Sequence, residues 1–115
     1  MLKYFMVATL LATPLFAGSA LADGIEGEWK RPTGILVKIS KCGGEFCVSP
    51  ISGKHKGESA GKMAPAGGGK YVGSLTDLEA GKTYSGKGAI SGDSLTMSGC
   101  VLGGLFCKSE SWERQ

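Results

Sequence analysis

Residues 83–101 read TYSGKGAISGDSLTMSGCV, and this stretch decides the fold class. Two extended runs, Thr83–Ser91 and Ser94–Val101, flank the dipeptide Gly92-Asp93, which is typical of a tight hairpin turn. Apolar and polar residues alternate along the second run, as they do in a strand that buries one face. The stretch therefore predicts an antiparallel β-hairpin.

Similar runs recur along the rest of the chain, and glycine supplies 20 of the 115 residues. Nowhere after Ala22 does a helical spacing of apolar residues continue without an interrupting glycine. The further strands expected are Gly27–Arg31, Ile35–Lys41, Phe46–Ile51, Lys70–Asp77 and Phe106–Arg114, with residues 58–64 as a weaker candidate. We expect an all-β fold, a small antiparallel up-and-down barrel of seven or eight strands, because closure removes unpaired strand edges. A sandwich is the alternative, although its crossing connections are typically longer than these turns.

The first 22 residues have the features of a secretory signal peptide. Lys3 precedes an apolar run, Tyr4–Leu15, and Ala20-Leu21-Ala22 supplies small residues at the positions that a signal peptidase reads. A run of about 12 residues is too short for a bilayer core, which needs roughly 20. We expect cleavage before Asp23, a single barrel domain over residues 23–115, and a periplasmic or secreted protein.

The charge of the chain after cleavage argues against a nucleic-acid partner. Of the 13 Lys and Arg residues one leaves with the leader, while all 10 Asp and Glu residues remain, so the net charge falls from +3 to about +2. The densest basic stretch, Lys54–Lys62, contains no aromatic residue that could stack on bases. It lies in a glycine-rich segment, residues 53–69, for which we expect a mobile connection more than a ligand-covering lid.

The four cysteines form two spacings, Cys42-x4-Cys47 and Cys100-x6-Cys107, each across a Gly-Gly pair. In an exported chain an even number of cysteines indicates disulfides. Pairing within each hairpin is the simplest connectivity, but the energy of loop closure does not select it over a bridge such as Cys42 to Cys107. A metal site would need closer cysteine pairs and a second histidine, and a redox site would need C-x-x-C at a helix start.

The sequence offers no catalytic constellation. His55 is the single histidine, and it lies in the glycine-rich segment without a G-x-S-x-G motif. The carboxylates are dispersed, and Gly67-Gly68-Gly69-Lys70 lacks the Ser or Thr of a phosphate-binding loop. We therefore expect no enzyme activity, no metal and no cofactor, and we interpret His55 as a surface residue.

Several motifs together resemble one family. They are Gly27-x-Trp29, Cys42-Gly43-x-x-Phe46-Cys47, Gly81-Lys82-Thr83-Tyr84-Ser85-Gly86, Gly99-Cys100-Val101-Leu102-Gly103-Gly104-Leu105-Phe106-Cys107-Lys108, and Trp112-x-Arg114. The chain resembles the exported bacterial family catalogued as domain of unknown function 2147 over nearly all of residues 23–115. It departs from the family pattern between Val48 and Met63, where this chain is rich in glycine.

The resemblance implies a lipocalin/calycin-like barrel with no established activity. Gly27-x-Trp29 is also similar to the opening signature of lipocalins, in which an arginine of the last strand stacks on the tryptophan at the base of the barrel. Arg114 is the matching residue here. The contact would be a cation-π interaction of about 0.5 to 2 kcal/mol, with a structural role in closing the barrel.

The alternation of side chains predicts which residues line the barrel interior. The candidates for ligand contact are Val37, Ile39, Tyr71, Tyr84, Met97, Lys108, Glu110 and Trp112. Gly73, Gly86, Gly88 and Gly99 share the inward face and would leave space. We therefore expect a binding protein for a small apolar ligand. The alternative is an envelope interaction or inhibitor protein that uses Phe46 and Phe106 on disulfide-pinned rim loops.

Overall fold

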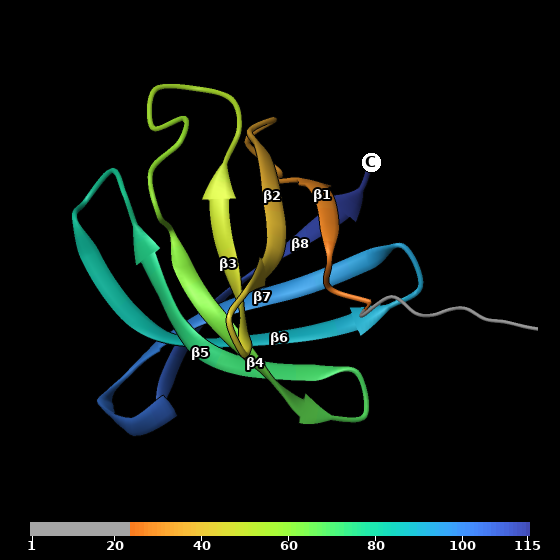
Figure 1. The fold of residues 1–115 in the computed structure, drawn as a ribbon. Coiled ribbons are helices and arrows are strands. Elements are labelled where there is room, and N and C mark those ends of the chain that lie inside the picture. The colour runs from red at the N-terminus through yellow and green to blue at the C-terminus, as the bar shows by residue number, and fades with distance from the viewer. Residues whose placement is uncertain (1–23) are drawn as a thin grey trace, which may run out of the picture.

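A computed structural model describes residues 24–115 as one closed antiparallel barrel (Figure 1). Its strands are β1 (Gly27–Lys30), β2 (Leu36–Cys42), β3 (Glu45–Pro50), β4 (Gly61–Gly67), β5 (Lys70–Asp77), β6 (Lys82–Ser91), β7 (Ser94–Val101) and β8 (Phe106–Arg114), with a short 3₁₀ turn, η2 (Leu102–Gly104), before β8. Each strand pairs with the next along the chain. The predicted all-β up-and-down barrel is confirmed, with eight strands.

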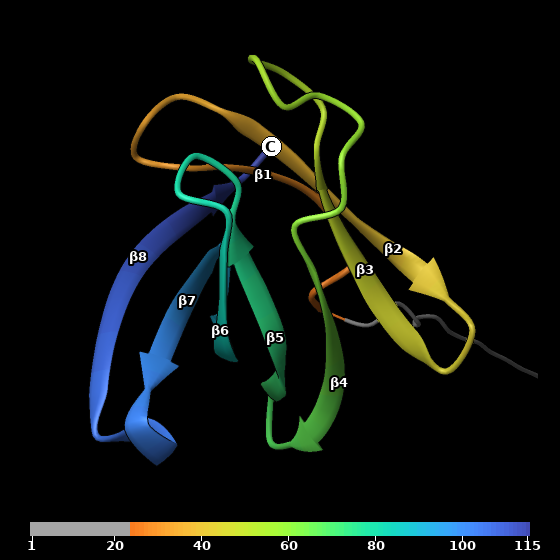
Figure 2. The same cartoon turned by 90° about the vertical axis from the view of Figure 1, so that its left-hand side faces the viewer.

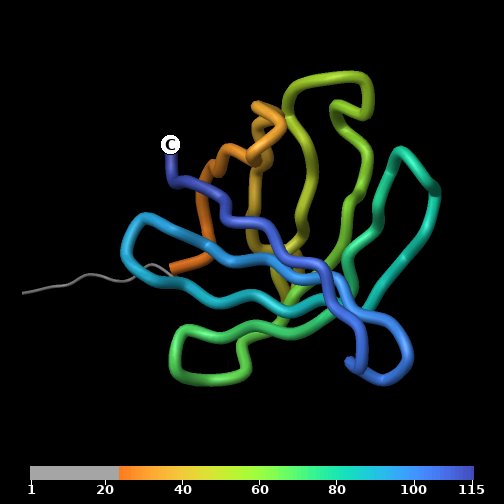
Figure 3. Tube along the Cα trace, turned by 180° about the vertical axis from the view of Figure 1, so that it is seen from behind, coloured from red at the N-terminus to blue at the C-terminus, as the bar shows by residue number. Residues whose placement is uncertain are grey.

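The barrel closes where the last strand meets the first. Trp29 of β1 lies opposite Arg114 of β8, and Lys30 lies opposite Glu113. Seen from behind, the chain ends beside β1 (Figure 3). The signal peptide expected at residues 1–22 lies outside the described residues.

The weaker strand candidate near residues 58–64 forms β4, so the glycine-rich segment is not a single connection. β4 pairs with β3 and β5, and its register shifts between Pro65 and Gly67. The connection between β3 and β4 is a loop over residues 51–60. This loop is tied to the barrel, because Ile51 N donates to Leu36 O at 2.9 Å and Ala60 N donates to Val48 O at 2.7 Å.

The turns divide between two ends of the barrel. One end, which we call the closed end, carries the turns at residues 43–44, 68–69 and 92–93. The open end carries residues 31–35, 51–60, 78–81 and 102–105, and Figure 2 views the barrel from that side. The open end therefore has the longer connections.

The core fills the closed end. Its largest members are Ile25, Trp29, Ile39, Phe46, Met63, Tyr71 and Leu95, each at most 5% exposed. The rings of Phe46 and Tyr71 meet edge to face, with centroids 6.0 Å apart. The expectation that Phe46 is an exposed anchor on a rim loop is therefore wrong, because it is a core residue at 3% exposure.

Trp29 and Arg114 form the contact that the resemblance implies. The guanidinium carbon of Arg114 lies 4.2 Å from the centroid of the Trp29 ring. The indole N–H of Trp29 donates to Ile25 O at 2.9 Å, and Arg114 Nη1 donates to Glu26 O at 3.1 Å. A second guanidinium nitrogen donates to Gly24 O. Arg114 thus fastens the segment before β1 across the base of the barrel.

Three of the four glycines expected to leave space inside the barrel, Gly73, Gly86 and Gly88, do not do so. A Cβ at Gly73 would collide with the backbone of β4 at Lys62, and one at Gly86 would lie 2.8 Å from Leu75 Cγ. At Gly88 it would lie 3.1 Å from Met97 Sδ. The volume that these glycines vacate is taken up by neighbouring chain, so they permit close packing instead of leaving a void.

The disulfides pair within hairpins, Cys42 with Cys47 and Cys100 with Cys107. The first lies in the β2–β3 hairpin at the closed end, and the second joins β7 to β8 beside η2 at the open end. Cys100 is 1% exposed, whereas Cys107 is exposed. Such bridges indicate an oxidising, extracytoplasmic environment.

Candidate functional site

A cavity of about 780 Å³ opens at the open end of the barrel. Its wall is mainly apolar, with Ile35, Val37, Val48, Leu75, Met97 and Trp112 among the lining residues. Charged and polar side chains gather at the mouth, among them Arg31, Lys54, His55, Glu79, Lys108 and Glu110. The volume falls within the range of small-molecule sites, about 300 to 1,000 Å³.

Six of the eight residues proposed as ligand contacts line this cavity, namely Val37, Tyr84, Met97, Lys108, Glu110 and Trp112. Ile39 and Tyr71 do not. Both are buried at the closed end, where Ile39 is 1% exposed and Tyr71 packs on Phe46. They were misplaced because alternation along a strand gives the face of a residue but not its depth in the barrel.

Lys108 and Glu110, the two charged residues proposed as ligand contacts, both line the cavity. Glu110 does not pair with Lys108 but accepts two hydrogen bonds from Arg31, from Nε at 2.9 Å and from Nη2 at 2.7 Å. The indole N–H of Trp112 donates to the same carboxylate at 2.8 Å. Arg31 lies just beyond β1, so this pair spans the junction of the first and last strands at the open end.

The electrostatics of this pair are set by its hydrogen bonds. The bonds from Arg31 lower the pKa of Glu110 below its ordinary value, partial burial opposes that shift, and the Trp112 bond adds to it. The pKa of Arg31 is raised, mainly by the hydrogen bond with Glu110. Both groups are therefore ionised near neutral pH, and a charge is neutralised beside the apolar wall.

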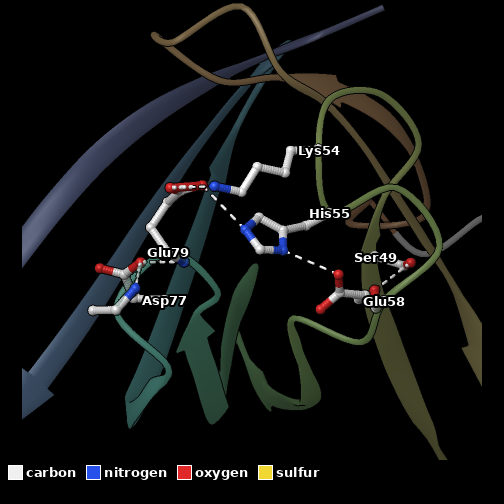
Figure 4. Close-up of polar contacts among 7 residues, drawn as sticks. Ser49, Lys54, His55, Glu58, Asp77 and Glu79 are labelled. Carbon is white, nitrogen blue, oxygen red and sulfur yellow. Dashed lines mark hydrogen bonds and ion pairs between the residues drawn. The ribbon is translucent and has the colours of Figure 1, made fainter.

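A second polar cluster ties two loops together at the mouth (Figure 4). His55, in the 51–60 loop, contacts Glu58 Oε2 through Nδ1 at 3.0 Å and Glu79 Oε2 through Nε2 at 3.1 Å. Lys54 Nζ lies 3.7 Å from the other oxygen of Glu79. We call these four residues the His55 clasp, because Glu79 belongs to the β5–β6 turn across the mouth.

The His55 clasp favours the protonated imidazole. The hydrogen bond to Glu58 is the largest cause that raises the pKa of His55, and the contacts with Glu79 act in the same direction. With both ring nitrogens facing carboxylates, the doubly protonated ring can donate to each, whereas the neutral ring can donate to only one. The clasp is therefore complete only when His55 is charged.

Sequence reasoning missed both polar groups of the mouth. Arg31 was only the last residue of the strand expected at Gly27–Arg31, and nothing local indicated Glu110 as its partner 79 residues away. His55 was interpreted as a surface residue, and its partner Glu79 lies 24 residues further along the chain. Partners at such separations become visible only when the barrel brings the loops together.

Residues 24–115 also show what this part of the chain offers for metal binding and for crossing a membrane. No group of three or more His, Cys, Asp or Glu side chains there is arranged to hold a metal ion. None of the helical segments in that range has the length and hydrophobicity to cross a membrane.

Comparison with known proteins finds a match to one family model. The model, described as an uncharacterized protein conserved in bacteria (DUF2147), matches residues 58–114. The predicted resemblance to this family is confirmed over that range. The match to DUF2147 covers β4–β8 and stops short of β1–β3, so it spans less of the chain than the motifs implied. It contains Glu79, Glu110, Trp112 and the Cys100–Cys107 disulfide, but not Trp29, Arg31 or His55. Neither a curated protein nor a solved structure matches the chain.

Proposed function

We propose that this protein binds a small, mainly apolar ligand in the cavity at the open end of its barrel. The observation that carries the proposal is the cavity of about 780 Å³, whose wall is largely apolar while its charges gather at the mouth. An apolar body would displace water from the wall, and the polar mouth would orient its end. The proposed role is binding and not catalysis, in the periplasm or outside the cell.

Paired charges at the mouth support an apolar preference. Arg31 and Glu110 satisfy each other, and the His55 clasp pairs its own charges. Lys108 lines the cavity without an ion pair among residues 24–115. A ligand that enters therefore meets a wall of aliphatic and aromatic groups with few polar groups demanding a partner.

The test is displacement of water from this cavity by a neutral apolar dye, N-phenyl-1-naphthylamine, with dye fluorescence and tryptophan emission as readouts. Ala60 lines the cavity and is only partly buried, so Ala60→Phe adds bulk inside without cutting a core contact. We expect at least a tenfold loss of dye affinity in Ala60→Phe. Ala66→Phe adds the same bulk on the exposed surface of β4 and should leave affinity unchanged.

Equal affinity in both variants, or no dye binding by the parent, would overturn the proposal. Native mass spectrometry of protein exported by its own host provides a second measurement. The expected result is an extra mass that is lost on extraction with organic solvent, and protein carrying no extra mass would count against a retained ligand.

The alternative, an envelope interaction or inhibitor protein acting through both disulfide-pinned loops, loses one of its two anchors. Phe46 is buried, and its hairpin lies at the opposite end from η2. Phe106 is 60% exposed and remains available for contact. The alternative would therefore rest on the β7–β8 turn alone.

A further inference from the structure

The turn between β7 and β8 exposes a group of large apolar side chains. We call it the apolar tip, residues 101–106. Leu105 is 73% exposed, Leu102 72%, Phe106 60% and Val101 41%. Among residues 24–115 only one other large apolar side chain, Val72, is comparably exposed. A contiguous apolar patch on a soluble surface indicates contact with another apolar phase.

The backbone holds the apolar tip in a fixed shape. The Cys100–Cys107 disulfide bridges its base, and Leu105 N donates to Leu102 O at 3.3 Å. Leu102 has a φ of 54°, the only positive φ outside glycine in residues 24–115. A leucine in this region is strained, and such strain persists where the surroundings fix it. The tip thus presents its side chains with little left to order on binding.

The charge around the apolar tip is positive. Lys108 follows it two residues after Phe106, and Lys87 Nζ would lie 3.9 Å from a Cβ at Gly104. No Asp or Glu occurs between Ser94 and Ser109. Apolar side chains flanked by lysines are complementary to a bilayer that carries anionic lipid.

The shape of the apolar tip also favours a bilayer. The tip forms a corner of the molecule, away from the 51–60 loop (Figure 1). A stable protein interface buries about 800 Å² on each partner, which calls for roughly 20 to 30 residues, whereas the tip contains six. Insertion into the boundary of headgroups and acyl chains needs only a few apolar side chains reaching about 5 to 10 Å deep.

We propose that the apolar tip docks the barrel on membranes containing anionic lipid, with Leu102, Leu105 and Phe106 inserted and Lys87 and Lys108 at the headgroups. Val101 and Phe106 also line the cavity, so docking brings the cavity mouth to the bilayer surface. An apolar ligand could then pass between lipid and cavity without crossing water. Docking itself does not depend on ligand binding.

The test is flotation with two kinds of vesicle. One contains phosphatidylcholine alone, and the other contains about 30% of the anionic lipid phosphatidylglycerol as well. The protein is produced from the full-length chain by an exporting host, and its N-terminus is checked by mass spectrometry, so that a retained leader does not bind the vesicles. We expect binding to anionic vesicles that falls as salt rises.

The variant L102N/L105S removes two tip side chains that do not line the cavity, and Asn accommodates the positive φ at position 102. We expect at least a tenfold loss of vesicle binding with unchanged thermal unfolding and unchanged dye affinity. Val72→Ser removes an exposed apolar side chain from the outer wall of β5 and should bind vesicles like the parent. Lys87→Gln with Lys108→Gln should remove the preference for anionic vesicles.

Several results would overturn the proposal. One is absence of parent protein from the floated vesicles, and another is equal flotation of L102N/L105S. Self-association abolished by L102N/L105S, without vesicle binding, would assign the tip to protein contact instead. Because dye binding is measured in solution, failure of docking and failure of the proposed ligand site give different results.

Discussion

The closed end of the barrel and its open end use the same eight strands in different ways. At the closed end Trp29, Met63 and Leu95 are fully buried, and Arg114 seals the base. At the open end the inward side chains stop short of filling the space, and paired charges surround the mouth. The difference teaches that the packed core and the proposed binding cavity occupy opposite ends of the same barrel.

The largest expected effect comes from emptying the closed end. Trp29→Ala removes a fully buried ring together with its hydrogen bond to Ile25 O and its contact with Arg114. We expect the free energy of unfolding to fall by about 3 to 5 kcal/mol. Chemical denaturation measures the loss, and Trp29→Phe gives a milder variant should the first fail to fold.

The matched change at the open end is Ile35→Ala. Ile35 is only partly buried and faces a space that already exists, so we expect a loss of about 1 kcal/mol or less together with weaker dye binding. Similar destabilisation by Trp29→Ala and Ile35→Ala would contradict the division between the two ends.

A smaller effect is expected from breaking the Arg31–Glu110 pair. The two side chains are 34% and 36% exposed, so solvent screens their attraction, and Glu110→Gln should cost about 1 kcal/mol or less at neutral pH. Because the pKa of Glu110 is lowered in the folded state, its contribution is present above the ordinary carboxyl pKa. This contribution to stability is lost as the pH falls through the lowered pKa of Glu110 in the folded protein.

Denaturation of the parent and of Glu110→Gln over a range of pH measures the contribution of the ionised Glu110 carboxylate to stability. The difference in unfolding free energy between the two proteins should shrink as the pH falls below about 4. A difference that stays constant down to pH 2 would show that the Glu110 charge is not responsible.

The smallest expected effect is a change in the pKa of His55, which belongs to the His55 clasp. The pKa of His55 is raised, so its contribution is complete below the ordinary imidazole value and is lost as pH rises through the raised value. Nuclear magnetic resonance should place the His55 pKa above about 6.5. Glu58→Gln should lower it most and Glu79→Gln less, since the Glu58 hydrogen bond is the larger cause.

The control for this titration is Asp93→Asn at the closed end, where Asp93 lies 3.8 Å from Arg114. It should leave the His55 pKa unchanged. A His55 pKa that does not respond to Glu58→Gln or Glu79→Gln would mean that the clasp does not form in solution.

Local patterns were enough for most strands, and the simplest cysteine connectivity, within each hairpin, is the one that the structure shows. Leu95 and Met97 were placed inward by alternation, and the structure buries both. The same rule failed for depth, because Ile39 and Val37 share a face while only Val37 reaches the cavity. It also failed for the glycines, since Gly73 and Gly86 face inward against neighbouring chain that fills the space.

The sequence by itself determined the periodicity and the turns, since each depends on residues close together in the chain, and it made pairing within each hairpin the simplest connectivity of the cysteines. Only the tertiary structure decided the cavity, the Arg31–Glu110 pair, the His55 clasp and the exposure of Phe106 against the burial of Phe46. The physical reason is barrel closure. Closure sets the end of the barrel at which each inward side chain lies. It also brings together residues that are far apart in the chain, such as His55 and Glu79, 24 positions apart, and Arg31 and Glu110, 79 positions apart.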